Sequence, residues 1–318
     1  MKNRVTLQME GGLGKQVALT SLIPYFKDKY KQLIVLSSFP EVFEFHPDVY
    51  RAIGYDTAFA FEEYINPSDD IFYACGYRQN NFRKQRMHLI DAACESINIT
   101  KQDNMKPSLY TADQYEEIAL ELKQQFGDYI LVQFHGGRNP SNLDAPKNIM
   151  AKDFPQKSTI ELIQQIRNKY PNLTIINMSL PGEFPIPGTV QLDFKYSVWF
   201  SIIKHCTTFI SIDSSLQHIS AAFNKTGIVL WGATNPKQWG WEHNINLENN
   251  QCSLDQYHCQ RPYFVPSVDL KNNGVGWECP HKICMQFENT AIIEELDKLI
   301  KDKQLQKPTI NMNEVIVK

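Results

Sequence analysis

The sequence lacks several features that would assign a protein to a class at once. Its 318 residues contain no apolar run near the roughly 18 residues that a membrane-spanning helix needs. The start, MKNRVTLQMEGG, has no long apolar segment of a secretory signal. The formal net charge of -3 supplies no overall basic field for nucleic acid or anionic lipid. We therefore expect a cytoplasmic protein without a membrane span, whose partners bind at local sites.

What the sequence does contain is an alternation of apolar β-rich runs and helical patterns. Hydrophobic residues make up 42% of the chain, enough for a sizeable core, and the length favours two domains. The first series is VTLQM, a helix from about Lys15 to Tyr30, QLIVLSS and IFYAC. The second is DYILVQF, STIELIQQIRNKY, TIINMS, YSVWFSIIKH, TTFISID, SSLQHISAAF and IVLWG. This order predicts an α/β fold of two doubly wound domains with parallel sheets.

A helical pattern from Tyr110 to Lys123 separates the two series. We therefore expect a Rossmann-like N-terminal domain over residues 1–115, a linker over 116–127, a C-terminal domain over 128–300 with a cysteine-rich insertion at 252–284, and a tail at 301–318. Two such domains place a cleft between the carboxyl ends of their strands, where ligands bind.

The turn between TTFISID and SSLQHISAAF concentrates polar groups. Asp213 ends the strand, and Ser214 or Ser215 takes the capping position of the next helix. The free N–H groups of that first turn favour an anion, and His218 can add a hydrogen bond to a phosphate oxygen. Ordinary helix capping and a buried core histidine are the alternative interpretation.

The run DSSLQHISAAFNKTGIVLWGATNP resembles the signature of glycosyltransferase family 9, the heptosyltransferases of lipopolysaccharide core synthesis. Upstream, AKDFPQKSTIELIQQI is similar to the family's K-x-W-P segment, with the same spacing from Lys152 through Pro155 to Glu161. Downstream, ECPHKICM is similar to the cysteine-bearing ending of some members. Together the three segments cover roughly residues 128 to 300.

The resemblance implies a GT-B fold whose second domain holds a nucleotide-diphospho-sugar, linked to ADP, UDP or GDP. It implies that Asp213 contacts the sugar and that Ser214 and Ser215 present N–H groups to the diphosphate. It also implies that His218 and Lys152 bind phosphate. By a looser alignment, it implies that Glu183 binds the ribose. The resemblance also implies inverting transfer. Fixed donors of this kind stabilise the charge on the leaving group, so we expect transfer that is independent of a metal ion. The second domain also has no D-x-D pair.

The loop MEGGLGKQ follows the first strand, and its glycines allow the backbone to approach a ligand. Gly12, Gly14 and Lys15 are therefore candidate donor contacts, although a glycine turn is also ordinary chain geometry. In family 9 the loop usually carries an Asp that acts as the general base. Lys15 stands in that place here, which makes Glu10 the candidate base. GGLGKQ is also similar to the GGLGNQ loop of certain fucosyltransferases.

The stretch ACGYRQNNFRKQRMH is basic within an otherwise acidic chain. It suggests an anionic acceptor, either a phosphorylated lipopolysaccharide core or nucleic acid. A solvated basic face is the alternative. The candidate acceptor-binding residues are Arg78, Arg83, Lys84 and Arg86.

Four of the seven cysteines cluster in a segment with little periodicity. Cys252, Cys259, Cys279 and Cys284 have the spacing C-x6-C and C-x4-C, which favours a structural zinc or iron site. Free thiols and disulfides are the alternatives. Some relatives of family 9 that glycosylate proteins carry an iron-binding four-cysteine finger, which would here support structure or oligomer formation.

The resulting prediction is a heptosyltransferase-like glycosyltransferase that transfers a sugar to a hydroxyl acceptor. One alternative is the same chemistry on modified DNA or on a protein. The other is an inactive nucleotide-binding or scaffold protein, which the position of Lys15 suggests.

Overall fold

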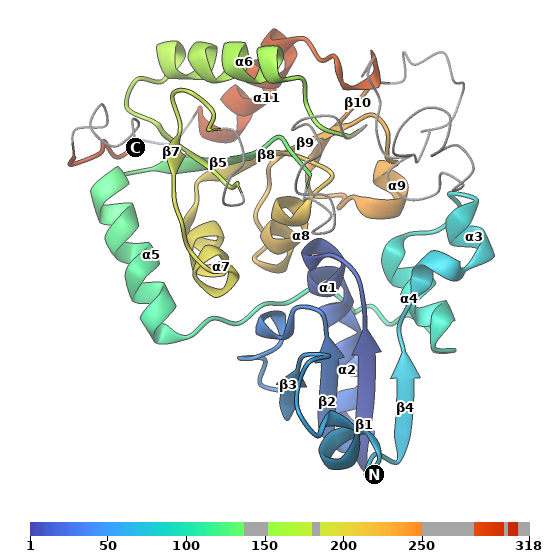
Figure 1. Ribbon diagram of the computed structural model, residues 1–318. Coiled ribbons are helices and arrows are strands. Elements are labelled where there is room, and N and C mark those ends of the chain that lie inside the picture. Colours follow the sequence, from blue (N-terminus) through green and yellow to red (C-terminus); the bar gives the residue numbers. More distant parts are fainter. Residues whose placement is uncertain (137–151, 180–184, 250–282, 302–304, 311–318) are drawn as a thin grey trace.

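The chain forms two α/β units, each built on its own parallel sheet, as the alternating pattern predicts (Figure 1). The computed structural model describes residues 1–136, 152–179, 185–249, 283–301 and 305–310. The first unit contains β1 (Lys2–Met9), α1 (Leu13–Leu19), α2 (Ile23–Lys27), β2 (Tyr30–Ser37), β3 (Arg51–Ile53), β4 (Asp70–Tyr73), α3 (Asn80–Arg83) and α4 (Leu89–Ser96), with short turns η1 (Thr20–Leu22), η2 (Pro40–Val42), η3 (Phe61–Ile65) and η4 (Gly76–Arg78).

The second unit follows α5 (Asp113–Phe126). It contains β5 (Tyr129–Gln133), α6 (Gln156–Lys169), β6 (Thr174–Asn177), β7 (Val190–Gln191), α7 (Tyr196–His205), β8 (Thr208–Ile212), α8 (Ser215–Ala222), β9 (Ile228–Trp231), α9 (Pro236–Trp239), β10 (Ile245–Glu248), η7 (Ile283–Met285) and α11 (Asn289–Ile300). In Figure 1, α6 and α11 cover one face of its sheet, and α7 and α8 cover the face toward the first unit.

The helix expected from about Lys15 to Tyr30 is divided. α1 ends at Leu19, a 3-10 turn follows, and α2 begins at Ile23 with Pro24 in its first turn. Proline has no backbone N–H to donate to the preceding turn, and its ring clashes with that turn's carbonyl groups, so a helix tends to stop and restart at this residue.

In both sheets, the strand that comes first in the chain lies between the next strand of the sequence and a later one. The first sheet has the order β3-β2-β1-β4, and the second has the order β10-β9-β8-β5-β6-β7. The chain therefore turns in opposite directions on the two sides of β1, and again on the two sides of β5. Ligands of open parallel sheets bind at the carboxyl ends of the strands at such switch points. The expected sites after β1 and after β8 each lie at a switch point.

The expected linker, residues 116–127, is almost wholly helical and is held by the second unit. Glu116 of α5 accepts hydrogen bonds from Ser201 (3.0 Å) and from His205 (2.7 Å) on α7. Near the C-terminus, residues 305–310 return to the end of α5, where the Gln306 carbonyl accepts from the Asp128 N–H at 2.9 Å. The proposed domain boundaries themselves stay a prediction.

The two units share one continuous apolar core. A cluster of buried side chains runs from Val5 and Leu7 of β1 to Phe200 of α7 and Trp239 of α9. α1 packs directly against α8 across the junction (Figure 1). Within the described part of the chain, no helix combines the length and the apolar character needed to cross a bilayer.

Candidate functional site

The turn between β8 and α8 gathers polar side chains at the switch point of the second sheet. Asp213 directly follows β8 and is only 2% exposed. Ser214 is the N-cap residue of α8 and Ser215 is its first helical residue. The first amides of a helix have no partner within the helix, and its dipole is positive at this end. The turn therefore has the geometry of an anion site.

A glutamine from the neighbouring strand caps this helix. Gln133, the last residue of β5, accepts hydrogen bonds through Oε1 from the Ser214 hydroxyl (2.6 Å) and from the Leu216 N–H (3.0 Å). Ser214 thus occupies the capping position, but its own side chain makes no capping hydrogen bond. Gln133 already uses the Leu216 amide, so an anion at this turn would be bound by the other amides of the first turn, which include those of Ser214 and Ser215.

Lys152 lies beside the same turn. Its Nζ donates to the backbone carbonyl of Asp213 at 2.7 Å, and its side chain is buried. Two segments that are far apart in the sequence are therefore brought together, as the spacing of the motifs suggests. The ammonium stabilises the end of β8 and adds positive charge at the entrance to α8.

His218 lies one turn into α8 and is 4% exposed. Burial lowers its pKa to about 4, so the ring is neutral at pH 7. The Trp241 indole Nε1 donates to His218 Nδ1 at 3.2 Å. The neighbouring Gln217 donates through its amide nitrogen to the Trp239 carbonyl at 3.0 Å.

The glycine loop of the first unit meets this turn directly. A Cβ at Gly14 would lie 2.6 Å from His218 Cδ2 and 3.2 Å from Ser215 Cα, so only glycine allows α1 to approach α8 this closely. Gly11 has a φ of +113°, a conformation that residues with a side chain rarely adopt. The switch points of the two sheets therefore face each other across Gly14.

Lys15 extends toward the segment that follows β4. Its Nζ lies 3.8 Å from Cys75 Sγ and 4.2 Å from the centre of the Tyr77 ring, and the residue is 5% exposed. Burial lowers the pKa of Lys15, while Cys75 and Glu10 partly oppose that change. Its ammonium therefore lies on the first-unit side of the junction, and not against the first turn of α8.

Glu10 lies at the carboxyl end of β1. Its Oε2 accepts a hydrogen bond from the Tyr73 hydroxyl at 2.8 Å, and the residue is exposed. Burial, together with the charge of Glu10, raises the pKa of Tyr55 to about 12, which shows that Tyr55 is near this carboxylate. Glu10 is thus an accessible carboxylate that accepts a hydrogen bond from one phenol.

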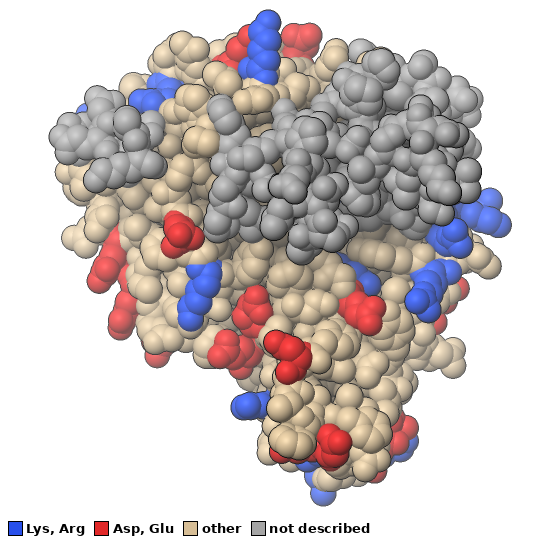
Figure 2. All heavy atoms as spheres, viewed as in Figure 1, with Lys and Arg blue, Asp and Glu red and all other residues tan. Residues whose placement is uncertain are grey.

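The basic segment lies along the junction of the two units. Arg78 ends η4 and Arg83 ends α3, and both are exposed, as are Lys84 and Arg86. Figure 2 shows basic side chains at the right edge, where Figure 1 places α3. No ion pair found among the described residues includes any of the four.

Several contacts attach this basic segment to the second unit, and two of them are hydrogen bonds from side-chain amides. Asn235 donates to Gln85 at 3.0 Å, and Gln238 donates to the Phe82 carbonyl.

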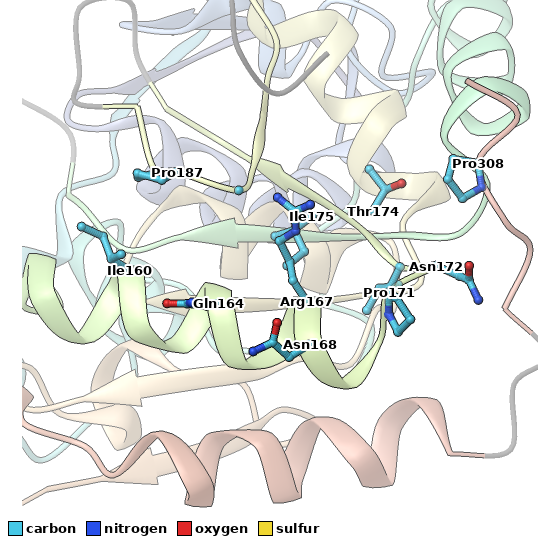
Figure 3. A pocket seen from close by; sticks show the side chains of 12 residues that line it. Ile160, Gln164, Arg167, Asn168, Pro171, Asn172, Thr174, Ile175, Pro187 and Pro308 are labelled. Carbon is cyan, nitrogen blue, oxygen red and sulfur yellow. The ribbon is translucent and has the colours of Figure 1, made fainter. Parts of the chain in front are cut away.

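A separate pocket of about 400 Å³ lies at the opposite edge of the second sheet (Figure 3). It is lined by Arg167 and Asn168 of α6, by Thr174 at the start of β6 and by Pro187. Because the strands are parallel, their starts lie at the edge opposite to Asp213. This pocket therefore does not belong to the site at the switch points.

Some of the expected site residues lie outside the described ranges: Glu183, Cys252, Cys259 and Cys279. Cys284 is described and is buried in the apolar cluster that includes Met285. The described residues contain no group of three or more His, Cys, Asp or Glu side chains that could hold a metal ion. They include only one of the four clustered cysteines.

Comparison with protein families identifies the second unit. Residues 197–264, which include most of α7 and all of β8 and α8 and extend past Trp241, match the model of glycosyltransferase family 9 (heptosyltransferase). The chain is a glycosyltransferase whose second unit resembles family 9. No curated protein sequence matches it.

Several solved glycosyltransferases are similar in fold to nearly the whole chain. A family 9 glycosyltransferase from Veillonella parvula has a TM-score of 0.64 at 12% identity and covers 94% of this chain and 98% of its own. ADP-heptose lps heptosyltransferase II of E. coli has a TM-score of 0.64 at 12% identity and covers 96% and 100%. The dodecameric iron-containing heptosyltransferase TibC in complex with ADP-D-beta-D-heptose has a TM-score of 0.58 at 12% identity and covers 94% and 78%. The glycosyltransferase therefore has the GT-B fold.

Three residues that support the site lie outside the motifs that the sequence contains. Gln133 caps α8 from another strand. Trp241, which contacts His218, lies five residues beyond the last proline of the motif. His88, which contacts the Gly240 carbonyl, is the last residue of the basic stretch. The tryptophan pair in QWGW, directly after the motif, is the one sequence feature that could have drawn attention to this loop.

Proposed function

We propose that this glycosyltransferase moves a sugar from a nucleotide-diphospho-sugar to a hydroxyl of an anionic acceptor, with inversion and without a metal ion. The observation that carries the proposal is the meeting of the two switch points across Gly14. A donor held at α8 and an acceptor held after β1 and β4 would then react at the junction of the units.

The donor half is assigned to the second unit. The amides of Ser214 and Ser215 bind the diphosphate, Lys152 and His218 add donors to its oxygens, and Asp213 contacts the sugar hydroxyls. Glu183 is proposed for the ribose. As the glycosidic bond breaks, negative charge grows on the leaving diphosphate, and fixed donors stabilise that charge more strongly than they stabilise the ground state. This is why the proposed mechanism needs no divalent cation.

The proposed donor is an ADP-linked heptose or a related ADP-, UDP- or GDP-sugar. TibC is the relevant neighbour, since its structure holds ADP-D-beta-D-heptose. At 12% identity the likeness extends to the fold, and the sugar and the base have to be measured for this chain.

The acceptor half is assigned to the first unit. Glu10 is the proposed general base, because its accessible carboxylate sits at the carboxyl end of β1 and is oriented by Tyr73. Gly12 allows close approach. Lys15 is expected from the sequence as a donor contact, but it is proposed here to attract an anionic group of the acceptor, because its Nζ lies beside Cys75 and Tyr77 of the first unit. Arg78, Arg83, Lys84 and Arg86 extend that positive surface along the junction. A lipopolysaccharide core is the proposed acceptor, and nucleic acid is the alternative.

The clustered cysteines are a separate proposal. We propose that Cys252, Cys259, Cys279 and Cys284 hold a structural zinc or iron ion, as their spacing suggests. TibC is described as iron-containing and dodecameric, so the metal content of this chain should be measured together with its oligomeric state. Elemental analysis tests the proposal, and less than about a tenth of an equivalent of either metal would overturn it.

Release of nucleoside diphosphate tests the function. A thermal-shift screen of nucleotide sugars first identifies the donor, because a ligand that binds the native state raises the apparent stability. Turnover is then measured with that donor and with phosphorylated glycolipid or DNA acceptors. Binding of the nucleotide without turnover of any sugar would favour the scaffold alternative.

The variant Glu10→Gln tests the base in the same assay. We expect kcat to fall roughly 100-fold or more, since general-base catalysis typically contributes a factor of about 10² to 10⁴. Donor affinity should not change, because Glu10 belongs to the acceptor half. An unchanged kcat would overturn the assignment of Glu10 while leaving the function intact.

A further inference from the structure

Three aromatic rings from both units are in contact behind the β8–α8 turn. The centroids of His88 and Trp241 are 5.1 Å apart, and those of Trp241 and His218 are 5.9 Å apart. The planes are steeply inclined in both pairs, at 65° and 88°. Trp241 is thus placed edge to face between a histidine of the first unit and the histidine of the proposed donor site.

The contact with Trp241 determines where His218 carries its proton. An indole N–H can only donate, so His218 Nδ1, which lies 3.2 Å from Trp241 Nε1, must accept. Burial keeps the ring neutral at pH 7, and a neutral imidazole has one proton. That proton is therefore on Nε2.

The Nε2–H is not used by an acceptor within the described part of the chain. The polar atom beside it is the Gln217 amide nitrogen at 3.3 Å, which is itself a donor. Two acceptors identify that atom as nitrogen: the Trp239 carbonyl at 3.0 Å and Asp213 Oδ1 at 3.4 Å. The adjacent ring atom, Cδ2, faces Gly14 of the glycine loop. The unused N–H is therefore on the ring edge nearest to the junction of the units.

His88 holds the tryptophan loop from the first unit. Its Nδ1 accepts from the Ile90 N–H at 3.3 Å, so the ring caps α4. Its Nε2 must then carry the proton, and it lies 3.0 Å from the Gly240 carbonyl, which can only accept. Both ring nitrogens of His88 are thus engaged, and the backbone just before Trp241 is attached to α4.

We propose that Trp241 is a positioning residue that keeps His218 in the Nε2–H tautomer, so that this N–H donates to a phosphate oxygen of the nucleotide sugar. His88 supports the arrangement by fixing the Trp241 loop to the first unit. The inference rests on the proposed function, since it requires a diphosphate beside α8. It goes beyond that function by assigning roles to two residues outside the family motif.

Loss of the indole N–H has a specific consequence. The neutral ring of His218 would then be able to carry its proton on either nitrogen. In the Nδ1–H form, Nε2 presents a lone pair toward the phosphate oxygens, which repel it. Donor affinity should therefore fall in proportion to the population of the wrong tautomer, even when the fold is intact.

The test compares Trp241→Phe with the wild type and with Trp199→Phe. The first change keeps an aromatic ring and removes the indole N–H. The second removes an indole N–H from Trp199 of α7, which forms no hydrogen bond or ring contact with His218 among those found in the described part of the chain. Nitrogen-15 NMR of histidine-labelled protein at pH 7 reports the tautomer, and the variant His218→Gln assigns the signals among the eight histidines. The ligand is ADP, UDP or GDP, whichever the wild type binds most tightly.

We expect the wild type to show His218 as Nε2–H and Trp241→Phe to show a mixture of tautomers. Affinity for the diphosphate should fall in Trp241→Phe by the factor by which the Nε2–H population falls, about twofold for an equal mixture, and should not change in Trp199→Phe. A wild-type Nδ1–H tautomer overturns the inference, and this holds even when a variant does not fold. So does a loss of affinity without a change of tautomer, or a change of tautomer without loss of affinity. Failure of the wild type to bind any of the three diphosphates would count against the proposed function instead.

Discussion

The two switch points hold their polar side chains in different ways. After β8, Asp213, Ser214 and Lys152 are buried and hydrogen-bonded to other parts of the second unit. After β1 and β4, Glu10 and Arg78 are exposed, and Glu10 has a single tyrosine partner. The proposed donor side is thus held in place by hydrogen bonds within the second unit, which suits stabilisation of one leaving group. The proposed acceptor side is exposed and charged, which suits steering and selection of a partner.

The largest expected effect is a loss of kcat on substitution of Asp213, which is proposed to contact the sugar. Asp213→Asn keeps the volume of the side chain and removes its charge, so we expect kcat to fall roughly 100- to 1000-fold. Affinity for the free nucleoside diphosphate should change little, because the proposed contact is with the sugar. The control is Asp193→Asn, an exposed aspartate of the same unit. A diphosphate affinity that falls as much as kcat would contradict the assignment to the sugar.

The buried histidine of the donor side should make the protein sensitive to acid. Burial lowers the pKa of His218 to about 4, below the value near 6.5 of an unfolded chain. The unfolded state therefore binds the proton first, and stability is lost as the pH falls from 6.5 toward 4. At pH 4.5 we expect a loss of about 2 kcal/mol from this group relative to pH 7.

Urea unfolding of the wild type and of His218→Gln at the two pH values measures that loss. His46, whose pKa burial also lowers to about 4, lies in the first unit and makes a similar contribution in both proteins. The difference between the proteins therefore isolates His218. An equal loss of stability in both would show that His218 does not titrate as the burial implies.

The pattern of the sequence predicts the turn between β8 and α8 well. TTFISID and SSLQHISAAF are separate, strongly patterned segments, and the structure has β8 and α8 where they end and begin. Parallel pairing then brings the carboxyl ends of the strands to one edge, so the positions of Asp213 and Ser214 follow from local information.

What the sequence does not reveal are the partners that come from a distance. Gln133 caps α8 because β5 and β8 are neighbours, and that order depends on the whole sheet. Trp241 contacts His218 because a loop after α9 folds back, and nothing in its spacing indicates this. The sequence pattern does not predict the short strands β3, β7 and β10 either, since two to four residues carry too little periodicity.

The contact between the two sides can be weakened at one glycine. Gly14→Ala places a Cβ 2.6 Å from His218 Cδ2 and 3.2 Å from Ser215 Cα, so α1 and α8 must move apart. We expect a loss of roughly 1–3 kcal/mol in the free energy of unfolding, together with weaker diphosphate binding. Gly12→Ala is the matched control, because a Cβ there meets nothing within 4 Å. Equal stability of the two variants in urea would mean that the junction is loose in solution.

The smallest expected effect is on the KM for the acceptor, when exposed charges of the basic segment are removed. Arg83→Ala with Lys84→Ala removes two exposed charges that form no ion pair with the described residues, so we expect the KM for the acceptor to rise about 3- to 10-fold. Donor affinity should not change. The wild-type KM should rise with salt, and the variant should respond less, because salt screens exposed charges. The control, Lys157→Ala, removes an exposed charge on α6. If the control raises KM as much, the basic segment has no special role, and selection of the acceptor has to lie deeper, at Glu10 and Lys15.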